Sequence, residues 1–315
     1  MTRLWLALCI ALGGAVWPLG TAVGQVSILT PVSAYYDWEY DLATASDYQL
    51  ETGINAGGAF SVLRFEGSGR GGGPFSQNLR LFMDFAYVNA DYDFGFPIPV
   101  GCPDPAACFT GSPWNTTHRV DLSPGVSIVL TDRFHIQLMV PMRWHFESGS
   151  EASGFTGGLV GVLRLQLSDD FTAALGVAVQ SEIEEGTSIY PVIGLDWRFS
   201  KGLAIETSGG PYQGGTAALV WRPGEAVQMR LSVGYERRRF RLARDLTNPD
   251  GVGEYTSVPL LGGLLLNLGQ NVDLSFEGGI ATAGELDIEN ARGLRLRRES
   301  FDTAGLLRGR LALEW

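Results

Sequence analysis

The sequence Phe-His-Ile-Gln-Leu-Met-Val-Pro-Met-Arg-Trp-His-Phe, residues 134–146, alternates large apolar side chains with mostly polar ones. Successive side chains of a β-strand point to opposite faces, so this stretch presents one apolar face along its whole length. Strands of soluble sheets usually have about 5–6 residues, whereas a strand that crosses a bilayer needs about 9–11. The stretch therefore favours a membrane-spanning strand.

The same alternation recurs along the chain and predicts twelve strands, with two further candidates within residues 34–66. The glycine-rich stretch Gly67–Gly73 reads as a flexible turn that follows them. An even total of twelve or fourteen strands places both chain ends on the same side of the membrane. The twelve predicted segments are 78–92, 118–130, 134–146, 155–167, 171–182, 189–199, 203–209, 214–222, 227–242, 255–267, 272–283 and 303–315.

The predicted connections alternate in length, which is the arrangement of outer-membrane barrels. Short ones lie near residues 132, 169, 201, 224 and 270, and longer ones near 93–117, 147–154, 183–188, 243–254 and 284–302. Aromatic residues such as Trp197 and Trp221 flank the short turns, and others such as Phe155 flank the long loops, as in the two aromatic girdles of a membrane barrel. The predicted fold is all-β: a transmembrane antiparallel up-and-down β-barrel of 12–14 strands with short periplasmic turns and longer extracellular loops.

The amino terminus predicts export. A basic start at Arg3 precedes the apolar stretch Leu4–Trp17, and the small residues of Ala22–Gly24 suit signal-peptide cleavage after Gly24. We expect residues 1–24 to be a secretory signal peptide and residues 25–315 to form one barrel domain in the outer membrane of a Gram-negative cell. The carboxy-terminal strand, which ends in Trp315, is the expected contact for the barrel-assembly machinery.

Composition narrows the possible partners. The 315 residues carry 34 acidic and 23 basic side chains, a formal charge of −11, and no basic domain, which argues against nucleic-acid binding. Cys102 and Cys108 lie in a proline-rich loop, and in an exported chain they are expected to form a local disulfide. A metal site would need more ligands than His118 supplies nearby. We predict neither a metal nor a cofactor.

The strand face opposite the lipid is expected to carry charges of both signs. Arginine can bridge neighbouring carboxylates, so these side chains favour an ion-pair network that fills much of a narrow lumen. The alternative is a narrow selective channel lined by the same charges, with no prediction of ion preference. The inward positions are Arg80, Asp84, Arg119, Asp121, His135, Arg143, His145, Arg164, Asp196, Arg198, Glu206, Arg230, Glu236, Asp273, Glu277, Arg308, Arg310 and Glu314.

Arginines also gather near the long loops, where they could bind lipopolysaccharide phosphates by charge-assisted hydrogen bonds. Acidic residues of the same loops, including Asp245, Glu254 and Glu285, make pairing within the protein the favoured alternative. Outer-membrane lipids and lipopolysaccharide are the expected surroundings in either case. The cluster comprises Arg237, Arg238, Arg239, Arg241, Arg244, Arg292, Arg295, Arg297 and Arg298.

Four segments of the carboxy-terminal half carry a resemblance: Ser188–Trp197, Gly234–Leu242, Gly251–Pro259 and Gly278–Leu286. They resemble a family of outer-membrane β-barrel proteins of Gram-negative bacteria that is catalogued as a domain of unknown function. The resemblance covers most of residues 55–315 and implies the barrel and its compartment. It implies no catalytic or ligand-binding residue.

The sequence favours a porin-like passive channel or a structural barrel over an enzyme. A lipid hydrolase would need a serine and a histidine near the outer leaflet. His118 and His145 are predicted to lie near the outer rim of adjacent strands, with Ser148 and Ser150 close by. However, alternation turns His145 inward, and no motif surrounds either serine. A carrier of hydrophobic molecules is a further alternative, which the inward charges oppose.

Overall fold

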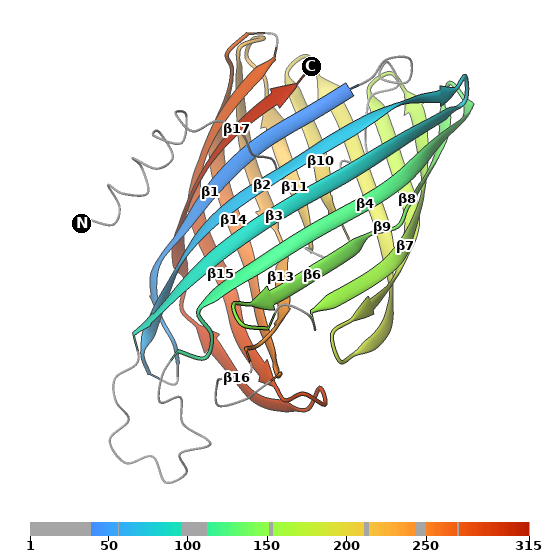
Figure 1. Ribbon diagram of the computed structural model, residues 1–315. Helices are drawn as coiled ribbons and strands as arrows, with labels where there is room; N and C mark the ends of the chain where they lie inside the picture. Colours follow the sequence, from blue (N-terminus) through green and yellow to red (C-terminus); the bar gives the residue numbers. More distant parts are fainter. Residues whose placement is uncertain are drawn as a thin grey trace, which may run out of the picture.

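A single antiparallel sheet closes on itself to form a barrel (Figure 1). The computed structural model describes residues 39–55, 57–95, 112–150, 154–210, 214–243, 250–269 and 271–314. β1 (Glu39–Gly53) pairs with β17 (Ala304–Glu314) over nine residue pairs, which joins the first strand to the last. The segments between them are β2 (Ala59–Ser76), β3 (Leu79–Gly95), β4 (Thr116–Thr131), β5 (Phe134–Met139), β6 (Met142–Glu147), β7 (Phe155–Ser168), β8 (Phe171–Glu182), β9 (Gly186–Ser200), β10 (Leu203–Gly210), β11 (Gly214–Trp221), β12 (Val227–Gly234), β13 (Glu236–Arg241), β14 (Val252–Asn267), β15 (Val272–Glu289) and β16 (Arg295–Phe301).

Within the described residues, the seventeen segments make fourteen barrel strands, because three strands are interrupted once each. The break between β5 and β6 falls at Val140 and Pro141, where proline has no backbone N–H to give to the sheet. The others fall at Tyr235, between β12 and β13, and at Asp302 and Thr303, between β16 and β17. The larger of the two predicted strand numbers is therefore confirmed.

The outer surface of the barrel is apolar and ringed by aromatic side chains. Leu159, Leu175 and Leu231 are more than half exposed, as expected of side chains that would face lipid. Outward-facing aromatic residues occur at both ends: Phe134, Trp197, Phe199 and Trp221 by the short turns, and Tyr87, Phe155 and Tyr235 by the long loops. The structure describes no helix long and apolar enough to cross a membrane.

Two predicted boundaries are wrong. Gly67–Gly73 is not a turn but the middle of β2, which pairs with β1 and β3 along this stretch. The predicted long loop at 284–302 is mostly strand, because β15 continues to Glu289 and β16 returns from Arg295. The predicted signal peptide (1–24), the disulfide cysteines Cys102 and Cys108, and Trp315 lie outside the described residues.

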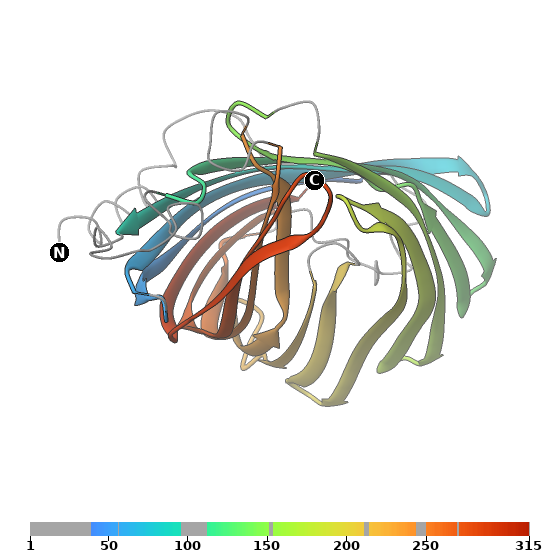
Figure 2. The ribbon, with the colours of Figure 1, turned by 90° about the horizontal axis from the view of Figure 1, so that it is seen from below.

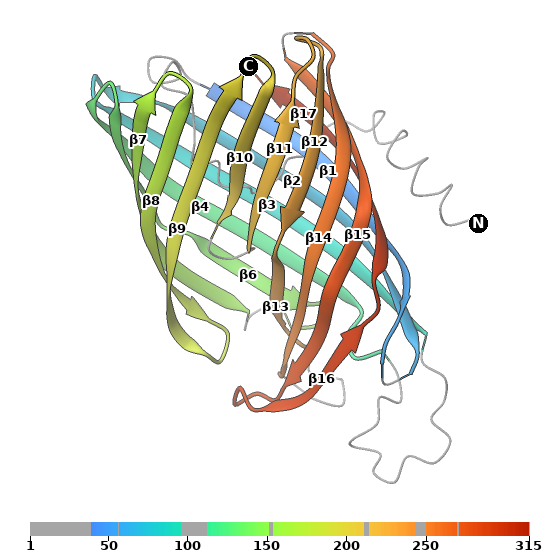
Figure 3. The same cartoon turned by 180° about the vertical axis from the view of Figure 1, so that it is seen from behind.

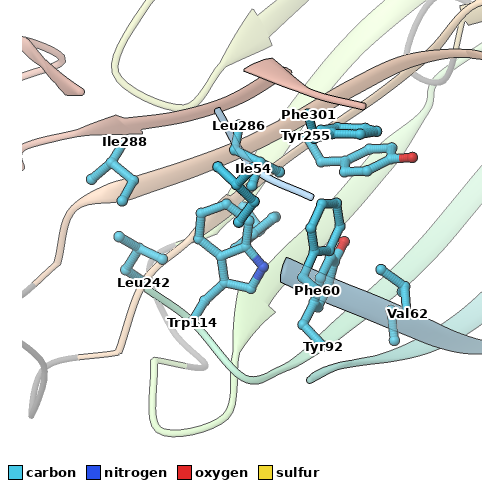
Figure 4. Packing of buried hydrophobic residues seen from close by; sticks show 12 residues of the cluster. Ile54, Phe60, Val62, Tyr92, Trp114, Leu242, Tyr255, Leu286, Ile288 and Phe301 are labelled. Atoms are coloured by element: carbon cyan, nitrogen blue, oxygen red, sulfur yellow. The ribbon is translucent and has the colours of Figure 1, made fainter. Parts of the chain in front are cut away.

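The long-loop end of the barrel is filled by a cluster of apolar side chains that we call the apolar plug (Figure 4). β13, β14, β15 and β16 supply one side of it, and β2, β3 and the loop residue Trp114 supply the other. Phe60 meets Phe301 edge to face, with ring centroids 5.0 Å apart, and Trp114 meets Phe240 at 5.2 Å. The plug comprises Ile54, Phe60, Val62, Ala90, Tyr92, Trp114, Phe240, Leu242, Tyr255, Leu286, Ile288 and Phe301.

We predict that Phe60→Ala lowers the free energy of unfolding by about 3–5 kcal/mol, the usual cost of removing a buried phenylalanine ring. Phe60 has no exposed surface, so its loss leaves a cavity between β2 and β16. The urea midpoint for loss of the fast-migrating folded band on an unheated gel measures the effect. Leu296→Ala, which shortens a side chain that is 57% exposed, is the control. Equal midpoints for the two variants would contradict the packing described here.

Candidate functional site: the barrel lumen

Below the apolar plug, an ion-pair network crosses the lumen, and Arg64 of β2 lies at its centre. The Arg64 guanidinium is 2.9 Å from Asp47 of β1, 2.8 Å from Glu236 of β13, and 3.4 Å from Glu66 of its own strand. Arg238 of β13 donates to the same oxygen of Glu236 at 2.8 Å. Because β2 and β13 are not neighbours in the sheet, these contacts join separate parts of the wall across the interior.

The network extends to both sides of Arg64. On one side Glu66 lies 3.4 Å from Arg119 of β4, and Asp121 lies 2.9 Å from Arg119 and 2.5 Å from Arg143 of β6. On the other side Arg308 of β17 lies 3.8 Å from both Asp47 and Glu277. Five carboxylates thus meet five guanidinium groups, and this balance allows so many charges to be held away from water.

Arg238 connects the network to the apolar plug. Its guanidinium lies over the Tyr255 ring at 4.7 Å and within 3.5 Å of the Tyr92 hydroxyl, and both rings belong to the plug. A cation above an aromatic face is attracted by the ring electrons, more strongly where water is absent. The plug and the charge layer therefore pack as one closure of the long-loop end.

The lumen is wetter at the short-turn end. Arg70–Asp84, Arg80–Glu39 and Arg222–Glu206 form local pairs there. On β9 and β12, Arg198 is exposed and Arg230 half-buried, and neither has an ion-pair partner among the described residues. Guanidinium groups without carboxylate partners need water. The inner wall from β9 to β12 is thus hydrated near the short turns.

The structure places the predicted inward charges on the inner face, but it joins only some of them. Arg119, Asp121, Arg143, Glu236, Glu277 and Arg308 belong to the network, and Arg80 and Asp84 form separate pairs. Arg164 lies on the same face, as do Asp196, Arg198, Arg230 and Arg310, which among the described residues have no ion pair with the network.

Sequence reasoning missed the centre of the network. Asp47, Arg64 and Glu66 come from β1 and β2, the region whose strands were the least regular in sequence. The alternation of Arg64 and Glu66 with Leu63 and Phe65 is the signal that could have revealed them.

A second part of the inner wall is apolar. Phe82, Met139, Val160, Val162, Ala174, Ala178 and Val192 form one buried cluster, with Tyr190 packed against it. Apart from Phe82 of β3, these residues belong to β5, β7, β8 and β9. We call the residues of these four strands the apolar sector. The lumen wall is therefore charged on the side of β1, β2 and β4. On the side of β5 and β7–β9 its middle part is apolar, and Arg164, Asp196 and Arg198 lie nearer the short turns.

The tip of the β8–β9 hairpin is held against β13 by arginines of the predicted basic cluster. Arg237 lies 2.8 Å from Glu182, Arg239 3.1 Å from Glu185, and Arg241 2.5 Å from Glu184. Glu184 has a left-handed backbone (φ 63°), which costs free energy and persists only where its surroundings hold it. Burial, with a hydrogen bond to Glu182, raises the pKa of Glu185.

The remaining arginines of that cluster that can be described pair mostly within the protein. Arg295 and Arg298 both contact Asp287, and Arg297 contacts Glu299. This agrees with the favoured alternative of local pairing. Arg244 lies outside the described residues.

At the long-loop rim, the outer face carries a serine–histidine pair. His118 of β4 lies 2.9 Å from the Ser148 Oγ through Nε2, and 2.9 Å from the Tyr87 hydroxyl through Nδ1. His145, the other candidate histidine, is buried on the inner face against Phe240. The structure thus brings together one of the two pairs considered from sequence.

No family model matches the chain, and no curated protein matches it in sequence. Among solved structures, an outer membrane channel from Pseudomonas putida F1 is 11% identical at a TM-score of 0.45, over 91% of this chain and all of that one. The P. putida toluene transporter TodX is 8% identical at 0.42, over 90% of each chain. The KdgM porin is 9% identical at 0.29, over 85% of this chain and 98% of its own.

All three matches have TM-scores below 0.5 and concern the β-barrel fold alone. The family of unknown function that the sequence resembles is not assigned by any of them.

We predict that Glu236→Gln destabilises the barrel by about 3–5 kcal/mol, because Arg64 and Arg238 would then share a neutral partner inside a dry layer. Glu299→Gln, which removes a more exposed pair with Arg297, should cost about 0–1 kcal/mol. Urea unfolding followed by the folded gel band compares the two. The same midpoint for both would show that the network adds nothing to stability.

Proposed function

We propose that the protein is a passive outer-membrane channel whose lumen is closed at the extracellular end. The observation that carries this proposal is the change of the lumen along its axis. Near the short turns Arg198 is exposed, and neither it nor the half-buried Arg230 has an ion-pair partner among the described residues, whereas the apolar plug and a charge layer fill the long-loop end. A barrel with a water-filled entrance and one closed end has the parts of a gated pore.

The proposed orientation follows from the usual rule for outer-membrane barrels. Short turns face the periplasm and long loops face the outside, so the hydrated entrance would be periplasmic. The apolar outer surface would contact membrane lipids, with lipopolysaccharide around the long-loop rim. Recognition of the last strand by the barrel-assembly machinery remains part of the proposal.

In planar bilayers, we expect the wild-type protein to give small or infrequent channel openings, because the plug and the ion-pair network close the lumen. Phe240→Ala removes a ring that packs on Trp114 and Tyr92, and should make openings larger or longer. Leu296→Ala is the control and should behave like the wild type. Silence of the folded wild type and of Phe240→Ala alike would favour a purely structural barrel.

The serine–histidine pair supports a second candidate function, hydrolysis of lipid esters at the outer rim. The Ser148 oxygen would attack the ester carbonyl while His118 Nε2 accepts its proton. The ester C–O bond would then break, and the lipid alcohol would leave with that proton. Water, activated by the same histidine, would later release the acyl group as a fatty acid. For this, His118 must carry its own proton on Nδ1 and donate it to the Tyr87 oxygen. Both His118 and Tyr87 point outward, toward the level of the long-loop girdle.

Release of fatty acid from phospholipid in mixed micelles tests this second function. Ser148→Ala should abolish the release, whereas Ser150→Ala, a change in a buried serine two residues away, should leave it in place. An absence of hydrolysis by the wild type, or equal rates for the wild type and Ser148→Ala, would exclude the pair as an active site.

A further inference from the structure

The barrel wall is incompletely paired between β9 and β10. β9 pairs with β8 over twelve residue pairs, from Trp197 to Gly186, but with β10 over only four, from Ser200 to Asp196. Beyond Asp196, β9 continues for ten residues without a partner on this side among the described residues. Figure 3 shows the two strands adjacent near the short turns and diverging toward the long loops. We call this unpaired boundary the seam.

The seam begins at Leu195, where the backbone of β9 bonds to the Thr207 side chain of β10 and no longer to the β10 backbone. The Thr207 hydroxyl accepts from the Leu195 N–H at 2.7 Å and contacts the Leu195 carbonyl at 3.4 Å. The Leu195 backbone groups therefore point toward β10. Since these groups alternate sides along a strand, those of Ile193, Pro191 and Ile189 point the same way. Proline has no N–H to leave unpaired, so Pro191 suits this edge.

The seam lies at the depth of the apolar band. A strand tilted by about 40° rises roughly 20 Å across the membrane between residues 189 and 197. Trp197 marks the short-turn girdle, so Ile189–Leu195 spans most of an apolar band about 25 Å tall, from roughly 5 to 20 Å above Trp197. Ile189 and Ile193, 70% and 69% exposed, are more exposed than other outward-facing aliphatic residues of the wall. Unpaired backbone groups at this depth are costly unless water or a ligand reaches them.

Both ends of the seam are fixed. Near the short turns it ends at the paired residues Asp196 and Glu206. At the long-loop end, the β8–β9 hairpin is attached to β13 by the ion pairs of Arg237, Arg239 and Arg241. The end view in Figure 2 shows this hairpin bending toward β13–β16. The edges between these two points can therefore separate without opening the rest of the barrel.

The inner wall beside the seam is the apolar sector. Val192 and Tyr190 are the inward residues of β9 at the height of the seam, and Ala178 of β8 lies next to them. The charged residues Asp196, Arg198 and Glu206 begin only below it, toward the short turns. A molecule that entered at the seam would meet apolar side chains first and water later.

We propose that the seam is a lateral passage through which small uncharged apolar molecules move between the lipid bilayer and the lumen. This inference rests on the proposed channel function and adds the route and the class of solute to it. The contacts of Thr207 with Leu195 hold the two edges together at the short-turn end of the passage.

A disulfide across the seam tests the passage. Ile193→Cys and Gly209→Cys extend the register of the Asp196–Glu206 pair, so their disulfide would join the two edges. Cells that make the protein should take up the apolar dye N-phenyl-1-naphthylamine faster than cells without it. The oxidised double variant should lose this gain, and a membrane-permeant reductant should restore it. All variants also carry Cys102→Ser and Cys108→Ser, so that native thiols do not compete.

The matched control is Val179→Cys with Ile189→Cys, which joins β8 and β9 where they are already paired and should leave dye uptake unchanged. Thr207→Val keeps the side-chain size but removes the contacts with Leu195, and should speed dye uptake without requiring a disulfide. If dye uptake by the oxidised lock and by Thr207→Val equals that of the wild type, the passage does not exist.

Planar-bilayer conductance tests the proposed channel function independently of the lateral passage. Ions that follow the lumen do not cross the seam, so the locked variant should keep its openings. Openings with seam-independent dye uptake would overturn the lateral passage alone. Seam-dependent dye uptake without openings in any variant would instead overturn the end-to-end channel.

Discussion

The structure depends on one constraint: in lipid, each backbone N–H and C=O must find its partner inside the protein. Pairing of β1 with β17 satisfies this constraint where the first and last strands meet. Once the sheet is closed, its outer face must be apolar, and the inner face must bury whatever side chains remain. The balanced charges around Arg64 and the apolar plug are two ways of filling that interior.

The same constraint explains why the lumen differs from place to place. Near the plug, the network has five acids for five arginines, and an unbalanced charge would be expensive because water is absent. Near the short turns, Arg198 and Arg230 remain without a carboxylate partner among the described residues because water can reach them. Charge balance in this barrel therefore follows hydration, which is why the overall charge of the chain indicates no solute.

The fold was readable from sequence because each strand repeats a local pattern. In residues 134–146, alternation alone separates the lipid face from the inner face. The pattern failed at Gly67–Gly73, since glycine has no side chain to alternate and resembles a turn. It also could not show that Arg64 meets Glu236, or that Phe60 meets Phe301, because these contacts depend on which strands face each other across the lumen. Pro191 was a visible sign of an unpaired edge, but its meaning required the β9–β10 register.

The free-energy costs of opening the apolar plug and of opening the seam decide which of the two opens more easily. Burying one large apolar side chain contributes about 1.5–3 kcal/mol, so exposing even four plug residues costs on the order of 6–12 kcal/mol. The seam is held by the contacts of Thr207, and one hydrogen bond contributes about 0.5–1.5 kcal/mol. Separation of β9 from β10 above Asp196 is therefore far less costly than removal of the plug. In this barrel, the side wall at the seam is the weaker barrier and the plugged long-loop end is the stronger one.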